Sequence, residues 1–145
     1  MKFLILNGPN LNMLGIREPA IYGRTSYADI EKAIKEKCAA LGVGCEVVQS
    51  NHEGTLVDEI QRAYHEHFDG IVINPAAYTH TSVAIADAIK AVSLPTVEIH
   101  LSDPDTREAF RHVSYIRPLV IDTVKGEGWQ GYLHAIDILY AHISK

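Results

Sequence analysis

The chain has 145 residues, of which 47% are hydrophobic and 21% charged. This length is sufficient to bury a sizeable core, and we expect one domain over residues 1–145. Its formal net charge is −5 and no basic stripe stands out, which argues against a nucleic-acid-binding protein. No apolar run is long enough for a signal peptide or a membrane span, and Cys38 and Cys45 are interpreted as reduced packing residues, so a cytoplasmic protein is expected.

Apolar runs alternate with amphipathic segments along the chain. The continuous runs predict strands buried on both faces, and the segments with apolar residues every three or four positions predict helices. Ser26 and Asp29 have the spacing of a capping box at the first helix, and Tyr64 is expected to face inward on the second. In chain order the predicted strands are residues 2–6, 45–49, 70–74, 96–101 and 119–124, and the predicted helices are residues 26–41, 55–67, 82–92, 105–110 and 129–142.

Residues 7–23 form a long segment, rich in Asn, Gly and Pro, between the first strand and the first helix. Loops of this length are either functional or disordered. Tyr22 lies there between Arg17 and Arg24. A nearby guanidinium favours the phenolate form of tyrosine, which would make Tyr22 a usable general base. The alternative is a surface aromatic side chain.

The alternation of strands and helices implies a parallel sheet with helices on both faces, and five strands at this spacing fit the flavodoxin-like, doubly wound α/β order 2-1-3-4-5. Ligands bind such sheets at the carboxyl ends of strands 1 and 3, where the winding reverses. The polar residues expected at this crevice are Asn7, Asn74, His80, Glu98 and His100. Each of them also fits an ordinary turn or cap.

Several familiar kinds of site do not fit the sequence. Gly126, Gly128 and Gly131 match G-x-G-x-x-G, but they follow the last strand, so we interpret them as a tight turn into the last helix. The sequence has no P-loop and no nucleophile elbow. Lys125 is the only lysine near the end of a predicted strand, and that strand is far from the crevice, which disfavours Schiff-base chemistry.

Acid–base chemistry remains. Tyr22 is the candidate base, and His100 is the candidate acid because Glu98, two residues earlier on the same strand face, can orient it. A base and an acid, with amides to hold an oxyanion, suit proton abstraction beside a carbonyl followed by loss of a leaving group.

The chain resembles the type II 3-dehydroquinate dehydratase family nearly end to end. The similar stretches are LNGPNLNMLGIREPAIYG, QSNHEGTLVDEI, INPAAYTHTSVAIADAI, VEIHLSDPDTREAFRHVSYI and GEGWQGYLHAI. The resemblance implies a flavodoxin-like fold and the removal of water from 3-dehydroquinate to give 3-dehydroshikimate, a step of the shikimate route to aromatic compounds. It also implies no metal or organic cofactor, and a homododecamer built from trimers.

The resemblance assigns catalytic roles to five residues. Tyr22 would take the proton alpha to the ketone, and Arg17 would lower the pKa of Tyr22 and stabilise the developing charge. Asn10 would hold the water that hydrogen-bonds the enolate oxygen. His100 would protonate the departing hydroxyl, with Glu98 fixing its orientation. The segment around residues 17–24 would then be a lid that closes on the substrate.

Other residues are assigned to substrate binding by the same resemblance. The substrate carboxylate would be bound by Asn74 and the backbone amides of Leu101 and Ser102. The ring hydroxyls would be bound by His80 and Arg111, aided by Asp87 from a neighbouring subunit.

The sequence departs from the family pattern in three places. Ala76 stands where glycine is usual, Asp103 where asparagine is common, and Ser26 and Tyr27 replace a more usual Thr-Leu. Ala76 would add a methyl near the substrate, and Asp103 would add negative charge near the carboxylate site. Two alternatives stay open, a catalytically silent ligand-binding protein on the same fold and a dehydratase that works through a lysine imine.

Overall fold

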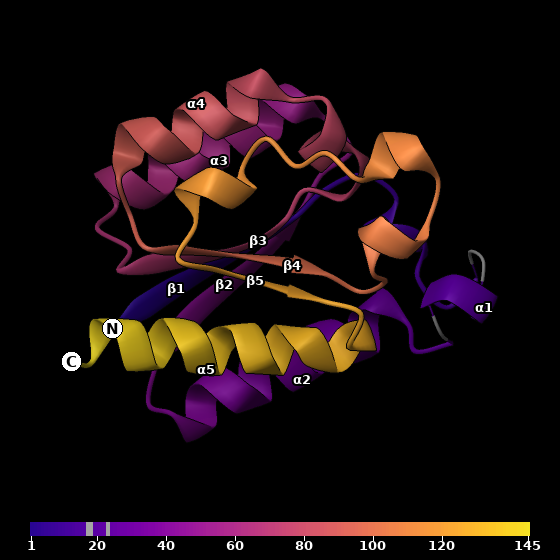
Figure 1. The fold of residues 1–145 in the computed structure, drawn as a ribbon. Helices are drawn as coiled ribbons and strands as arrows, with labels where there is room; N and C mark the ends of the chain where they lie inside the picture. Colours follow the sequence, from indigo (N-terminus) through magenta and orange to yellow (C-terminus); the bar gives the residue numbers. More distant parts are fainter. Residues whose placement is uncertain (17–18, 23) are drawn as a thin grey trace.

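The structure, a computed structural model, describes residues 1–16, 19–22 and 24–145, with only the backbone of Pro19 and Tyr22. Five parallel strands form one sheet in the order β2-β1-β3-β4-β5 (Figure 1), which confirms the predicted flavodoxin-like topology. The strands are β1 (Lys2–Asn7), β2 (Gly44–Gln49), β3 (Gly70–Asn74), β4 (Thr96–His100) and β5 (Asp122–Lys125).

Helices cover both faces of the sheet. On one face lie α2 (Tyr27–Ala40) and α5 (Gly131–Ile143), and on the other lie α3 (Glu53–His65) and α4 (Val83–Val92) (Figure 1). Each face has its own apolar core, and consecutive residues of β1 alternate between the two cores. This is why the predicted strands are continuously apolar rather than alternating.

Serine caps fix the starts of two helices. The Ser26 hydroxyl accepts a hydrogen bond from the backbone N–H of Asp29 at 3.1 Å, as its spacing predicted, and Ser82 caps α4 in the same way. The short helix α1 (Pro19–Tyr22) lies on the side of the molecule where the strands end (Figure 1).

The strand register brings the polar strand ends to one level. Asn7 is paired with Asn74 at the last position of the β1–β3 pair, and Ile73 is paired with Glu98 in the next strand. His100 is therefore the last residue of β4 and lies at the same edge of the sheet as both asparagines. The crevice expected from the topology is where these ends meet.

Two predicted elements differ from the structure by more than a shift of two residues at either end. Residues 105–110 are not one helix but two separate 3₁₀ turns, Pro104–Thr106 and Ala109–Arg111, because the backbone of Arg107 between them is extended. The fifth strand begins at Asp122 rather than residue 119, because Arg117–Leu119 forms a 3₁₀ turn. The apolar run at residues 119–121 precedes the paired strand instead of forming it.

Smaller corrections concern the helices. Tyr64 is 56% exposed on α3, so the prediction that it faces inward was wrong. The glycines after β5 form the expected turn: Gly126 and Gly128 have positive φ, and a Cβ on Gly131 would lie 2.8 Å from Ile99 Cδ1. Gly131 thus permits the close approach of α5 to the sheet.

Cys38 and Cys45 are free and pack in or against the same core, as expected. Within the described residues, no helix has the length and apolar character needed to span a membrane.

Candidate active site

A cavity of about 170 Å³ opens at the carboxyl ends of β1, β3 and β4. This is the switch point of a doubly wound sheet, where the topology predicted a ligand site. Of the predicted site residues, those that line the cavity are Asn10, Asn74, His80, His100, Leu101, Ser102 and Arg111.

Glu98 lies behind His100 and is completely buried. The Nε2 atom of His100 is 2.6 Å from Glu98 Oε2, so an ionised Glu98 accepts the Nε2–H. The other ring nitrogen, Nδ1, is then the atom left to exchange a proton with a bound molecule. This contact fixes the tautomer of the imidazole and gives it the orientation by Glu98 that the sequence predicted.

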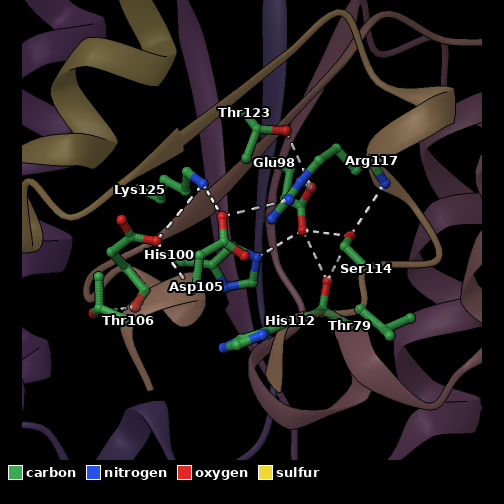
Figure 2. Close-up of polar contacts among 12 residues, drawn as sticks. Thr79, Glu98, His100, Asp105, Thr106, His112, Ser114, Arg117, Thr123 and Lys125 are labelled. Atoms are coloured by element: carbon green, nitrogen blue, oxygen red, sulfur yellow. Dashed lines mark hydrogen bonds and ion pairs between the residues drawn. The ribbon is translucent and has the colours of Figure 1, made fainter. Parts of the chain in front are cut away.

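Hydroxyl groups from three different segments hold the Glu98 carboxylate (Figure 2). Thr79 and Ser114 donate hydrogen bonds to Oε2 at 2.8 and 2.9 Å, and Thr123 donates to Oε1 at 3.2 Å. Nothing in the sequence spacing linked these residues to Glu98, because they come from the segment after β3, the segment before β5 and β5 itself.

This environment keeps Glu98 ionised. Burial alone would raise the pKa of its carboxyl, but the hydrogen bonds from His100, Thr79 and Ser114 outweigh burial and hold that pKa below its usual range. A positive charge lies nearby, because Arg117 Nε is 4.0 Å from Glu98 Oε1. Within the described chain, that Nε atom is buried without a hydrogen-bond partner.

His80 lines the cavity from the segment after β3. Its Nδ1 atom is 2.6 Å from the carbonyl oxygen of Val113, so Nδ1 carries the hydrogen and donates it. Burial lowers the pKa of His80 more than this hydrogen bond raises it, and His100 and Arg111 lower it further. His80 is therefore a neutral ring that can hydrogen-bond a substrate hydroxyl through Nε2.

Arg107 also lines the cavity, although the sequence analysis did not select it. Its Nη1 atom lies 3.4 Å from the hydroxyl oxygen of Ser102, beside the predicted carboxylate site. The four-residue spacing of Arg107 and Arg111 was the available signal. Glu108 Oε2 lies 3.9 Å from Arg107 Nε and 2.7 Å from Arg111 Nε, so two guanidinium groups share one carboxylate and this part of the wall keeps a net positive charge, which suits an anionic ligand.

The loop after β1 is attached to the loop after β2. The backbone N–H of Asn10 donates to Asn51 Oδ1 at 3.0 Å, and the side-chain amide of Gln49 donates to the same oxygen and to the carbonyl of Gly8. Asn10 has φ 69°, a left-handed conformation that asparagine tolerates better than most residues. These contacts hold Asn10 at the cavity.

The remaining predicted residues lie away from the cavity or outside the described residues. Asp87 is exposed on α4 and does not line the cavity of its own chain. The prediction for Arg17 falls outside the described residues, and so does that for the side chain of Tyr22, whose backbone ends α1.

The two departures from the family pattern near the site have different outcomes. Ala76 lines the cavity as expected and has φ 53°, a conformation that favours glycine. Asp103 does not line the cavity. Its Oδ1 accepts a hydrogen bond from the backbone N–H of Asp105 and lies 3.6 Å from Lys125 Nζ, so its charge is balanced outside the predicted carboxylate site.

The arrangement can perform proton transfer at His100 and can bind an anion with several hydroxyl groups. Among the residues that the structure describes, no group of three or more His, Cys, Asp or Glu side chains is placed to hold a metal ion. The cavity wall contains no lysine, and all seven lysines of the chain lie in the described ranges.

The chain is similar to known proteins over almost its whole length. A family model described as Dehydroquinase class II matches residues 1–140. A 3-dehydroquinate dehydratase of Dinoroseobacter shibae is 51% identical over 144 residues, which cover 99% of this chain and 95% of the relative. One from Geotalea daltonii is 53% identical over 145 residues and 100% of both chains. The crystal structure of a type II dehydroquinase from Butyrivibrio crossotus is 49% identical and superposes with a TM-score of 0.95 over 97% of each chain.

Proposed function

The chain belongs to the class II dehydroquinase family and is a hydro-lyase that removes water from 3-dehydroquinate, and we propose that it does so by an anti elimination through an enolate in the cavity after β1, β3 and β4. The product is the conjugated enone 3-dehydroshikimate. Residues 1–145 act as one catalytic domain in this proposal.

Proton abstraction is the first step. The phenolate of Tyr22 takes the proton alpha to the ketone, and the guanidinium of Arg17 favours the phenolate and the developing negative charge. The electrons left behind form the enolate, whose oxygen is hydrogen-bonded by a water held on Asn10. The position of Asn10 at the cavity, on a loop attached to Asn51, supports its part.

Loss of the hydroxyl is the second step. The enolate re-forms the ketone and the new double bond while the carbon–oxygen bond breaks, and His100 Nδ1 gives its proton to the departing oxygen, so that water leaves. Glu98 balances the imidazolium before this transfer and accepts the Nε2–H throughout. The 2.6 Å contact between His100 and a buried, ionised Glu98 is the single observation that carries this proposal.

Substrate binding uses the rest of the wall. The carboxylate is bound by Asn74 and the backbone amides of Leu101 and Ser102, and the ring hydroxyls by His80 and Arg111. Support comes from the position of all five residues around one cavity and from the positive charge that Arg107 adds beside Ser102.

The direct test is an ultraviolet assay for the enone with purified protein and 3-dehydroquinate. We expect turnover that His100→Ala reduces by at least about a hundredfold, the low end of what general acid–base catalysis usually supplies. An absence of enone from the unmodified protein would favour the alternative, a silent ligand-binding protein on the same fold.

The lysine-imine alternative is disfavoured because the cavity wall contains no lysine. Lys125, the lysine nearest a strand end in the sequence analysis, instead forms ion pairs with Asp105 and Asp103. Sodium borohydride added with substrate should therefore leave the mass of the protein unchanged. A covalent adduct in the mass spectrum would contradict the proposed mechanism.

The stereochemistry of the elimination is a second way to distinguish the enolate mechanism from the lysine-imine alternative. Tyr22 and His100 come from different elements, α1 and β4, and can therefore act on opposite faces of a flat enolate. Substrate deuterated stereospecifically at the carbon alpha to the ketone should lose the label expected for anti elimination. Loss of the other label would rule out this two-face arrangement.

The assembly is also a proposal. We infer a homododecamer built from trimers, because Asp87, which the resemblance assigns to substrate binding in a neighbouring subunit, is exposed on α4 and does not line the cavity of its own chain. Exposed apolar side chains, including Phe110 and Val113, offer surface for such contacts. Sedimentation should give an assembly larger than a monomer. A cytoplasmic location stays a prediction.

A further inference from the structure

A chain of buried polar groups connects helix α5 with the cavity wall. Tyr132 is 1% exposed, Asn7 0% and Asn74 2%. The Tyr132 hydroxyl lies 2.6 Å from Asn7 Oδ1 and 3.1 Å from Asn74 Nδ2. Of these three residues, only Asn74 lines the cavity. The catalytic scheme above uses neither Tyr132 nor Asn7.

The backbone N–H of Ala76 fixes the orientation of the Asn74 amide, from which the other hydrogen bonds of this chain follow. The N–H of Ala76 donates to Asn74 Oδ1 at 3.1 Å, so the oxygen of the Asn74 amide is identified and its nitrogen faces Tyr132. An amide nitrogen only donates, so the Tyr132 oxygen accepts from Asn74. The Tyr132 hydrogen must then go to Asn7 Oδ1, and the Asn7 nitrogen donates to the hydroxyl oxygen of Tyr27 at 3.4 Å.

We propose that Tyr132 is a positioning residue that holds the Asn74 amide with its nitrogen available to an acceptor oxygen of the substrate. One amide hydrogen of Asn74 is used on Tyr132, and the second remains for the cavity. The inference rests on the proposed function, in which Asn74 contacts the substrate carboxylate.

Binding of the substrate carboxylate would weaken if the side-chain amide of Asn74 could turn so that its oxygen and nitrogen exchanged places. With the two ends of Asn74 exchanged, an oxygen would face the substrate carboxylate, and two acceptors would repel each other. The exchange would set the amide nitrogen against the N–H of Ala76, and Tyr132 opposes it further, because Asn7 takes the only hydrogen of the phenol and leaves its oxygen as an acceptor. Burial raises the pKa of Tyr132, so the hydroxyl keeps its hydrogen across the working pH range.

Two variants test the proposal in different ways. Tyr132→Phe removes the acceptor for the Asn74 amide nitrogen. Asn7→Ala keeps both Tyr132 and Asn74 but frees the phenol hydrogen, which can then turn toward Asn74 and favour the exchanged amide. We expect each variant to raise KM for 3-dehydroquinate about tenfold with a much smaller change in kcat.

A double-mutant cycle separates positioning from general damage. In an Asn74→Ala background, Tyr132→Phe should change KM by less than about twofold, because the amide that it positions is absent. Tyr140→Phe is the matched control on the same helix and should leave KM unchanged. Urea unfolding of each variant shows whether the variant is folded. If Tyr132→Phe does not fold, Asn7→Ala takes its place in the cycle.

The outcomes distinguish the inference from the proposed function. If Asn74→Ala raises KM but Tyr132→Phe and Asn7→Ala do not, the positioning role is wrong and the substrate contact stands. If Asn74→Ala leaves KM unchanged, the assignment of Asn74 is wrong and the positioning role falls with it. Equal effects of Tyr132→Phe with and without Asn74 would also overturn the inference.

Discussion

Glu98 shows how a single buried carboxylate links stability to catalysis. The pKa of its carboxyl is lower in the folded protein than in the unfolded chain. Between the folded and the unfolded pKa value, the unfolded chain therefore binds more protons at this group than the folded protein does. The stabilisation from the ionised carboxylate is therefore complete above the unfolded value, roughly pH 4.3, and is lost as the pH falls toward and through the folded pKa. The same protonation removes the negative charge that Glu98 places beside His100.

We predict that Glu98→Gln lowers kcat by about ten- to a hundredfold while the protein still folds, because the neutral amide cannot balance an imidazolium at His100. The urea stability of this variant should also depend less on pH below about pH 4.3 than that of the unmodified protein. Glu36→Gln, a change of an exposed carboxylate on α2, is the control and should leave kcat unaltered. A steeper acid dependence in Glu98→Gln would contradict the assigned pKa direction.

Tyr22 gives a second prediction at this scale. Tyr22→Phe should remove nearly all turnover while substrate still binds, since the proposed carboxylate and hydroxyl contacts lie elsewhere. Arg17→Ala should move the acid limb of the pH profile of kcat/KM to higher pH, because the phenolate is the active form and Arg17 favours it. If the limb moves by about one pH unit, Arg17 favours the phenolate by about 1.4 kcal/mol. If Tyr22→Phe keeps more than about a hundredth of the activity, another residue is the base.

The sequence could predict those site residues whose positions follow from the strand order alone. Asn74 is the last residue of one predicted strand and His100 the last but one of another, and the strand order brings those ends together. The partners of Glu98 could not be found in the same way. Ser114 follows two irregular turns, and its hydroxyl reaches Glu98 only because that segment folds back over the end of β4.

At the scale of elements, the close approach of two loops determines the shape of the cavity. The N–H of Gly8, directly after β1, donates to the carbonyl of Asn74 at 2.8 Å. A Cβ on Gly8 would lie 2.4 Å from the carbonyl oxygen of Pro75, a backbone atom that cannot move alone. The absence of a side chain at residue 8 therefore places Asn74 against the end of β1.

Gly8→Ala should consequently destabilise the protein by about 1–3 kcal/mol and raise KM, because the loop carrying Asn74 must shift. Gly54→Ala is the matched control: a Cβ there meets nothing within 4 Å, and alanine favours helix α3 by up to about 1 kcal/mol. Urea unfolding and enone kinetics on both variants measure the two effects. Equal stability of Gly8→Ala and the unmodified protein would mean that the loops separate without cost.

The periodicity of the sequence predicted the long elements well and the short ones poorly. Strand β3 and helix α4 have a continuous apolar run or a repeating apolar face, and their predicted bounds are correct to within one residue. Residues 104–111 are too short for a helix to be stable without an apolar face to bury. Their shape depends on the cap by Asp103 and on the contact of Arg111 with Glu108.

At the scale of the whole molecule, the local charge of the cavity opposes the overall charge. The chain has a formal net charge of −5, yet Arg107 and Arg111 both line the site. An anionic substrate is therefore attracted by the cavity rather than by the protein as a whole, and KM should rise with ionic strength.

Asp87 makes the assembly testable through catalysis. Its neighbours on α4, Ala86 and Ala88, are buried, while Asp87 is exposed on a helix that covers the sheet face opposite α2 and α5. If Asp87 serves the site of a neighbouring subunit, each complete site takes His100 from one chain and Asp87 from another. Two inactive variants can then restore each other.

We predict that subunits carrying Asp87→Ala and subunits carrying His100→Ala, each poorly active alone, regain activity when refolded together. With equal amounts and random mixing, about a quarter of the sites combine an intact His100 with a neighbour's intact Asp87, so activity should approach a quarter of the unmodified level. Mixing His100→Ala with Asn74→Ala is the control, because both residues line the same cavity and no mixture can give an intact pair. No recovery in the test mixture would show that Asp87 does not act across subunits, and recovery in the control would show that mixing restores activity for another reason.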